Sequence, residues 1–345
     1  MTTTSTVASR LPHLLKDDDL TRTQLGQLLD TAARLKAARA ARTERPTLVG
    51  RTVAVLFEKP STRTRSAFEV AIYEQGGHCT YIDPASSHVG VTESIEDTAI
   101  VLGRLYDGIA FRGYAHADVE TLAQYAGVTV WNGLTDRWHP TQALADLLTM
   151  REHATKPLPQ TSVCFLGDAR DNVAHSLLTS GAIAGMDVRV ACPDRFRPDP
   201  EIVRAAEQIA VSSGGRVLVT ADVDEAVRGA DFLYTDVWVS MGEPREAWAE
   251  RIPLLRPYRI DRAMLERTGN PDVKFLHCLP AIHDRNSQLG RELASGYGLE
   301  GAEVADDVFE SPQSIVFDQA ENRMHTIKAV MLTSLIAPDP DSDEV

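Results

Sequence analysis

The stretch TVAVLFEKPSTRTRSAFEVAI, residues 52–72, contains a pattern that the rest of the chain repeats. Its first six residues, Thr52 to Phe57, are apolar or β-branched and predict a buried strand. Phe68, Ala71 and Ile72 follow at the spacing of a helix that buries one face. A strand, a turn and a helix in this order form the unit of a parallel sheet covered by helices.

The alternation of strands and helices continues on both sides of this stretch. Thr21 and Gln24 have the spacing of a capping box, which predicts a helix ahead of the first strand. Further strands are predicted at 80–82, 108–112, 128–131, 162–167, 187–192, 216–219, 232–235 and 273–277. Further helices are predicted near 95–105, 117–126, 140–153, 173–184 and 322–338.

This pattern predicts an α/β protein with two domains of similar size, each a parallel sheet flanked by helices, joined by interdomain helices. A chain of 345 residues with 43% hydrophobic residues also exceeds the usual size of a single core. The proline-containing segment TKPLPQ, residues 155–160, marks the boundary. We expect a first domain over 1–150, with the 322–338 helix packing back on it, and a second domain over 151–321.

Composition and charge argue against several classes of protein. No run of 18 or more uninterrupted apolar residues is present, which argues against a membrane span. The first ten residues, MTTTSTVASR, lack the apolar core of a secretion signal. A formal net charge of −14 disfavours a nucleic-acid partner. We therefore expect a cytoplasmic protein whose ligands are small molecules.

The sequence lacks the motifs of common cofactor and metal sites. It has no GxGxxG for a dinucleotide, and no Gly-Lys-Ser or Gly-Lys-Thr for a P-loop. It also has no HExxH and no cluster of His and Cys, so we expect neither a metal nor a cofactor. Four cysteines without a CxxC pair fit reduced thiols in the cytoplasm: Cys79, Cys164, Cys192 and Cys278.

The turn KPSTRTR, residues 59–65, has the composition of an anion site. It lies between a predicted strand and a predicted helix, where unpaired N–H groups and the positive end of the helix dipole face a ligand. Three hydroxyl groups and the guanidinium groups of Arg63 and Arg65 add donors that suit phosphate. The alternative is an ordinary capped helix start, which any Ser-Thr turn can provide. The two arginines favour phosphate.

PSTRTR, residues 60–65, resembles the carbamoyl-phosphate signature of the aspartate and ornithine carbamoyltransferases. Seven further segments along the chain are similar to the ornithine branch of this family. They are HVGVTES (88–94), FRGY (111–114), HPTQALAD (139–146), GDARDN (167–172), DVWVSMGE (236–243), HCLP (277–280) and ENRMHTIKA (321–329). Seven segments in register are far more specific than one.

The resemblance implies that the first domain binds carbamoyl phosphate. It assigns the phosphate to Ser61, Thr62, Arg63 and Thr64, and the surroundings of the carbamoyl group to Arg112, His139 and Gln142. It adds Cys278, Leu279 and Arg323, and His88 acting across a subunit interface. From the residues alone, the alternatives are a surface ion pair for Arg112 and a helix cap for His139.

The resemblance also implies an ornithine site in the second domain, made by Asn172, Asp236, Ser240 and Met241. Cys278 is expected beside the side-chain amine, where it and Asp236 favour loss of the amine proton. The catalytic residues are then Arg112, His139, Asp236, Cys278 and Arg323. A nucleophilic cysteine is the less favoured alternative, because an amine that attacks directly needs no covalent intermediate. Without the resemblance, Asn172 would be a helix-start residue and Met241 a core residue.

The implied reaction is transfer of the carbamoyl group of carbamoyl phosphate to L-ornithine, which gives L-citrulline and phosphate. The resemblance further implies a place in arginine metabolism and amino-acid biosynthesis, and a homotrimer or multiple of trimers with active sites at subunit interfaces. The alternatives are a carbamoyltransferase for lysine, putrescine or a secondary-metabolite precursor, and an inactive scaffold. Thr92 stands where many bacterial relatives have lysine. Its role stays open, as do the direction of the reaction, the binding order and the extent of domain closure.

Overall fold

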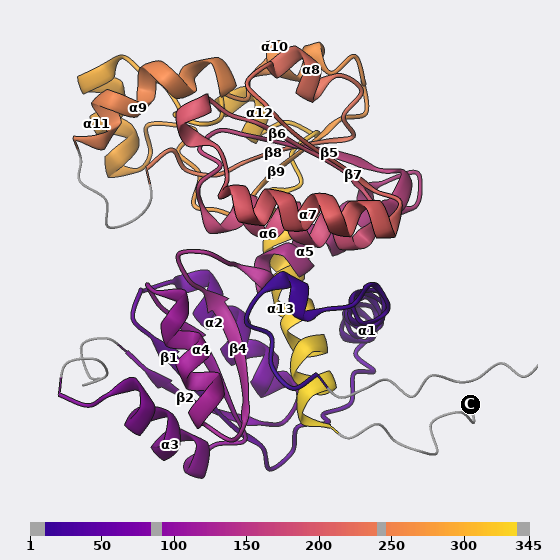
Figure 1. Ribbon diagram of the computed structural model, residues 1–345, viewed down its shortest axis with the longest axis vertical. Helices are drawn as coiled ribbons and strands as arrows, with labels where there is room; N and C mark the ends of the chain where they lie inside the picture. Colours follow the sequence, from indigo (N-terminus) through magenta and orange to yellow (C-terminus); the bar gives the residue numbers. More distant parts are fainter. Residues whose placement is uncertain (1–10, 84–91, 240–245, 337–345) are drawn as a thin grey trace, which may run out of the picture. The chain divides into compact units, whose positions relative to one another are not determined.

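The computed structural model describes residues 11–83, 92–239 and 246–336. It divides the chain into two compact units (Figure 1). Unit 1 comprises Met1–Ala145 and Asn322–Val345, and unit 2 comprises Asp146–Glu321. The predicted α/β class is confirmed, because each unit contains a parallel sheet flanked by helices, of four strands in unit 1 and five in unit 2. No helix in the described ranges is long and apolar enough to cross a membrane.

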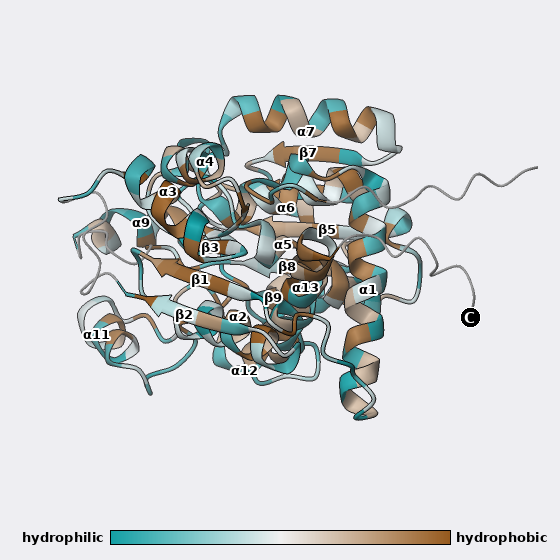
Figure 2. Ribbon diagram, turned by 90° about the horizontal axis from the view of Figure 1, so that it is seen from below, coloured by the Kyte–Doolittle hydropathy of each residue, from teal (hydrophilic) through white to brown (hydrophobic). Residues whose placement is uncertain are grey.

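The sheet of unit 1 has the strand order β2-β1-β3-β4, and every pairing in it is parallel. Its strands are β1 (Thr52–Phe57), β2 (His78–Ile82), β3 (Gly108–Arg112) and β4 (Thr129–Leu134). The central strand β1 is inaccessible to solvent from Val53 to Phe57, and Figure 2 colours it brown for hydrophobic. Since all four strands run the same way, their carboxyl ends lie at one edge of the sheet.

Helices cover both faces of this sheet. Helices α3 (Ile95–Leu105) and α4 (His116–Tyr125) pack on the face that carries Ala54, Leu56 and Ile109. The opposite face carries Trp131, whose Nε1 donates to Ser334 Oγ of α13 at 3.1 Å. The remaining elements of unit 1 are η1 (Asp17–Asp19), α1 (Arg22–Ala40), α2 (Thr62–Glu74), the start of α5 (Pro140–His153) and most of α13 (Val316–Leu335).

Helix α13 begins at Val316, six residues before the predicted start at 322. The early part was missed because the interactions that stabilise it are distant in sequence. Gln319 Nε2 donates to Asp146 Oδ1 at 2.7 Å and to Tyr234 Oη at 3.0 Å, all within unit 2. The boundaries between the two units therefore fall inside α5 and α13.

A buried lysine holds α13 in unit 1. Lys328 has a fully buried side chain, and its Nζ lies 2.7 and 2.9 Å from the two carboxylate oxygens of Glu44. The same ammonium group pairs with Glu74 of α2, which Arg39 of α1 contacts at 2.9 Å. Helices α1, α2 and α13 are thus joined by one charge network.

We predict that Lys328→Ala lowers the free energy of unfolding by about 3 kcal/mol, because it leaves two largely buried carboxylates without their shared cation. Urea unfolding followed by circular dichroism would measure the loss. The matched control is Lys16→Ala, which removes an exposed pair with Asp18 and should cost about 1 kcal/mol at most. Equal small losses in both variants would contradict a structural role for the Lys328 network.

The sheet of unit 2 has the order β7-β6-β5-β8-β9, again with parallel pairings. Its strands are β5 (Ser162–Leu166), β6 (Asp187–Ala191), β7 (Arg216–Thr220), β8 (Phe232–Thr235) and β9 (Lys274–His277). Helices α6 (Asn172–Ala184) and α7 (Pro200–Ser213) cover one face, and α8 (Val223–Val227), α10 (Arg262–Arg267) and α12 (Asp306–Phe309) cover the other (Figure 1). The other elements are α9 (Ala247–Leu255), α11 (Gln288–Tyr297), η2 (Leu158–Gln160), η3 (Asp194–Phe196) and η4 (Arg256–Tyr258).

Candidate active site

The phosphate-type turn lies at the carboxyl end of β1, where α2 begins. Ser61 caps α2, and its Oγ accepts the N–H of Thr64 at 3.3 Å. Thr62 and Arg63 follow in the first turn of this 13-residue helix. The N–H groups of that turn and the positive end of the helix dipole create a positive potential there, to which Arg63 adds its charge.

The hydroxyl group of Thr64 is the point at which three elements of unit 1 meet. Arg323 Nη2 of α13 donates to Thr64 Oγ1 at 3.0 Å, and Arg112 Nη1 at the end of β3 lies 3.5 Å from the same oxygen. Arg323 Nη1 also donates to Gln142 Oε1 of α5 at 3.1 Å. Arg112 is only 5% exposed and Arg323 only 3%, so neither arginine is a surface charge. The structure therefore brings together Thr64, Arg112, Gln142 and Arg323.

His139 is buried beside this group of cations. Burial lowers its pKa well below the usual 6.5, and the positive charges of Arg323, Arg112 and Arg63 lower it further. At neutral pH the imidazole is therefore uncharged, and it keeps one N–H donor and one acceptor nitrogen. A neutral imidazole can donate a hydrogen bond to an oxygen of a ligand without adding another positive charge beside the arginines.

We predict that His139 stays neutral at pH 6.5, where an exposed histidine is about half protonated. Imidazole shifts of histidine-labelled protein would show this in NMR. Because the unfolded chain binds this proton more readily than the folded one, the free energy of unfolding should fall as the pH drops below about 6.5. Arg323→Gln should raise the pKa of His139, and a midpoint near 6.5 in the parent protein would contradict the assignment.

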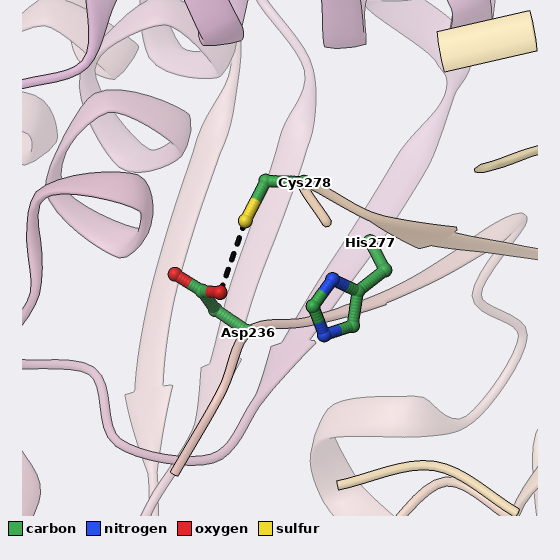
Figure 3. A group of neighbouring side chains, drawn as sticks. All are labelled: Asp236, His277 and Cys278. Atoms are coloured by element: carbon green, nitrogen blue, oxygen red, sulfur yellow. Dashed lines mark hydrogen bonds between the residues drawn. The ribbon is translucent and has the colours of Figure 1, made fainter. Parts of the chain in front are cut away.

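The corresponding edge of unit 2 carries acidic groups. Asp236 follows β8 and Cys278 follows β9, and Figure 3 shows their side chains pointing toward one another. Cys278 Sγ donates to Asp236 Oδ1 at 3.0 Å. Burial raises the pKa of the Cys278 thiol well above its usual value, and the charge of Asp236 and its hydrogen bond raise it further. The group is therefore a thiol that donates a hydrogen bond, which argues against a thiolate nucleophile.

Asn172 lies in the same neighbourhood, at the first residue of α6. The preceding residue, Asp171, caps this helix by accepting the N–H of Ala174 at 2.9 Å. Burial raises the pKa of the Asp171 carboxyl well above its usual value, and the charge of Asp236 raises it further. Asp171 was not predicted as a site residue, although it belongs to the same GDARDN segment as Asn172. Its closeness to a second carboxylate depends on the folded structure.

His277 and Leu279 complete the turn after β9. His277 is buried beside Asp236 and Cys278 (Figure 3), and its Nδ1 accepts the N–H of Leu279 at 2.9 Å. Its Nε2 lies 3.3 Å from the buried Glu303. Ligand-type atoms of Asp236, His277 and Cys278 lie within 4.8 Å of one another, as do those of a second group, His283, Asp306 and Glu310. In the first group His277 Nδ1 already accepts the N–H of Leu279.

Three predicted site residues, His88, Ser240 and Met241, lie outside the described residues. Thr92 is described and is exposed. All the other predicted site residues lie at or just after strand ends, at the starts of α2, α5 and α6, or within α13. They form two groups, a cationic one in unit 1 and an acidic one in unit 2.

We predict that Cys278 reacts slowly with iodoacetamide at pH 7.5, because its raised pKa leaves little thiolate. Asp236→Asn should speed this alkylation, since it removes the negative charge that disfavours the thiolate. Mass spectrometry of the peptide that contains Cys278 would give both rates. A faster reaction in the parent protein than in Asp236→Asn would show that the carboxylate does not control the thiol.

The comparisons with known proteins agree with this two-part architecture. The profile described as "Aspartate/ornithine carbamoyltransferase, carbamoyl-P binding domain" matches residues 12–152, and that described as "Asp/Orn binding domain" matches residues 160–334. Together these profiles define a two-domain carbamoyltransferase. The chain belongs to the aspartate/ornithine carbamoyltransferase family, which confirms the resemblance seen in the sequence.

Relatives in the ornithine branch match nearly the whole chain. The ornithine carbamoyltransferase of Haemophilus influenzae (strain PittGG) is 55% identical over 325 residues, which cover 94% of this chain and 97% of the relative. The crystal structure of ornithine carbamoyltransferase from Gloeobacter violaceus has a TM-score of 0.80 and 39% identity, and covers 95% of this chain and 99% of that one. The structure of ornithine carbamoyltransferase from Pyrococcus furiosus has a TM-score of 0.86 and 41% identity, and covers 94% of this chain and 97% of that one.

Proposed function

We propose that the chain transfers the carbamoyl group of carbamoyl phosphate to the side-chain amine of L-ornithine, giving L-citrulline and phosphate. The observation that carries this function is the group of Arg112, Gln142 and Arg323 around Thr64, in a chain 55% identical to ornithine carbamoyltransferases over 94% of its length. A carbamoyl phosphate ion carries its negative charge at the phosphate and gathers more on the carbonyl oxygen during attack. The cationic group suits both charges.

In the first half of the chemistry, unit 1 binds and polarises carbamoyl phosphate. The phosphate is bound by Ser61, Thr62, Arg63 and Thr64 at the start of α2. Donors from Arg112, His139, Gln142 and Arg323 surround the carbamoyl group and stabilise the oxygen as its charge grows. Each such fixed donor typically lowers the barrier by about 2.7 to 4 kcal/mol. Phosphate leaves with the electron pair of the broken C–O bond.

In the second half, unit 2 binds the amino acid and favours loss of a proton from its amine. Asn172, Asp236, Ser240 and Met241 hold L-ornithine, and the carboxylate of Asp236 suits a cationic group. The uncharged amine attacks the carbamoyl carbon directly, so a C–N bond forms and the C–O bond breaks. The proton that the attacking nitrogen then releases leaves with the phosphate as hydrogen phosphate. The thiol of Cys278, which donates to Asp236, supplies local polarity and forms no covalent bond with the substrate. Leu279, beside it, completes the carbamoyl contacts.

We also propose a homotrimer or multiple of trimers in which His88 reaches the carbamoyl phosphate of a neighbouring subunit. Exposed apolar side chains on two helices of unit 1 support an interface: Val70 and Tyr73 on α2, and Ile100, Val101 and Leu105 on α3. Tyr73 is 80% exposed and Leu105 is 65% exposed, which leaves two large apolar side chains open to a partner. Light scattering should give three times the chain mass of 37.8 kDa, or a multiple of that value.

A cytoplasmic location and a place in arginine metabolism, with amino-acid biosynthesis as one direction, complete the proposal. The four cysteines are free, as expected in a reducing compartment. The match to ornithine carbamoyltransferases supports a substrate and a product that are both amino acids of that metabolism.

The direct test is a transfer assay with the purified protein, carbamoyl phosphate and one amine at a time: ornithine, lysine, putrescine or aspartate. Citrulline formed only with ornithine, together with one phosphate for each citrulline, is the expected result. A strong preference for another amine would refute the substrate assignment while keeping the carbamoyl-phosphate half. If none of the four amines gives any product, the alternative of an inactive scaffold would be favoured.

The two halves of the site should respond to different substitutions. Arg63→Ala should raise the KM for carbamoyl phosphate by about tenfold or more and leave the KM for ornithine nearly unchanged, because it removes a charged contact to phosphate. Asp236→Asn should do the reverse. Steady-state kinetics with each substrate varied in turn would separate the effects, and equal changes in both KM values would contradict separate sites.

A further inference from the structure

The two residues that follow β1 contact the end of β3 and the turn after it at three points. Glu58, the residue after β1, donates its N–H to the carbonyl of Arg112 at 2.8 Å. Glu58 Oε2 accepts the N–H of Tyr114 at 3.1 Å. The ammonium group of Lys59 lies 4.4 Å from the centre of the Tyr114 ring, a distance at which a cation and an aromatic face attract each other.

The carboxylate of Glu58 fits into space that only glycine at position 113 leaves open. A Cβ on Gly113 would lie 2.4 Å from Glu58 Oε2 and 2.2 Å from the Phe111 ring. The far side of the turn is fixed separately, since Gly113 donates to the carbonyl of Leu134 at 2.9 Å. Through its side chain, Glu58 thus joins this turn to the segment that leads into the phosphate-type turn.

Glu58 is half-buried, and it has no assigned part in the reaction. Burial raises the pKa of its carboxyl group, while the hydrogen bond from the Tyr114 N–H opposes that rise. Partial burial of a carboxylate carries a cost, which the bond to Tyr114 offsets. Only two residues separate Glu58 from Ser61, so its position and that of the phosphate-type turn are closely linked.

We propose that Glu58 is a positioning residue that fixes Arg112 at a set distance from the phosphate-binding turn. This inference rests on the proposed function. In carbamoyl phosphate a single oxygen joins the phosphorus to the carbamoyl carbon. The protein groups that bind the phosphate and those that bind the carbamoyl group must therefore stay at a fixed distance from each other. A shift of about 1 Å in such a group can cost about 100-fold in rate. The Glu58–Tyr114 contact and the bond from the Glu58 N–H to the Arg112 carbonyl set this spacing through the backbone that follows Arg112.

The test compares Glu58→Ala, Glu58→Gln and Glu120→Ala with the parent protein. Glu58→Ala should raise the KM for carbamoyl phosphate by about tenfold or more and lower kcat by about 10- to 100-fold. The inhibition constant of inorganic phosphate, which needs only the phosphate turn, should change less than about threefold. Glu58→Gln keeps an oxygen that accepts the Tyr114 N–H, and it should recover most of the activity.

Glu120→Ala is the matched control, because it removes a carboxylate from α4, the helix after the same turn. Its side chain is 58% exposed and lies 3.7 Å from His116 Nε2, so its kinetics should match those of the parent. Parental kinetics in Glu58→Ala would overturn the proposal, and so would equal losses in Glu58→Ala and Glu58→Gln or an equal rise in the phosphate inhibition constant. Failure of the proposed function would instead appear as no citrulline from the parent protein.

Discussion

The structure of unit 1 depends on holding two nearly buried guanidinium groups against one threonine hydroxyl. Arg112 and Arg323 both approach Thr64 Oγ1, although their like charges repel and their burial removes water that would otherwise solvate them. The arrangement persists because three separately stabilised elements meet there. The end of β3 is fixed by the ladder to β1, α2 is capped by Ser61, and α13 is held by Lys328.

Unit 2 has the opposite charge at the equivalent sheet edge. Burial raises the pKa of the Asp171 carboxyl, the charge of the nearby Asp236 raises it further, and the thiol of Cys278 donates to Asp236. One carboxylate of such a pair can hold a proton at a pH where an isolated carboxyl group has lost it. The cationic group of unit 1 and the acidic group of unit 2 thus suit an anionic acyl phosphate and a cationic amino acid respectively. This difference in charge is the physical basis for assigning one substrate to each unit.

Much of this architecture could be predicted from the sequence, because its signals are local. The strand, turn and helix of residues 52–72 are predicted by apolar periodicity, and the structure places them at Thr52–Phe57 and Thr62–Glu74. Strand order was not predicted, since it depends on pairing between distant segments. The short helices α8, α10 and α12 have four to six residues, too few to show a helical period. Helix α7 was also missed, although Asp199 caps its start and the left-handed Gly214 marks its end.

The site residues also divide into those with a local signal in the sequence and those without one. The turn at residues 59–65 was predicted as an anion site from its own composition, whereas Arg112 could equally have been a surface ion pair until its burial was known. Asp171 and Glu58 gave no local signal, because their roles come from partners that are distant in sequence. Local composition thus finds the phosphate-type turn, whereas Arg112, Gln142 and Arg323, which meet through tertiary contacts, were assigned only through the family resemblance.

The most direct test of this account is calorimetric titration of carbamoyl phosphate into the purified protein without any amine. If the cationic group around Thr64 forms the main part of the anion site, carbamoyl phosphate should bind saturably at one molecule for each chain, and inorganic phosphate should compete with it. Binding should also weaken as salt is added, because the attraction is between charges. No saturable binding of carbamoyl phosphate, or binding that inorganic phosphate does not displace, would contradict the central claim.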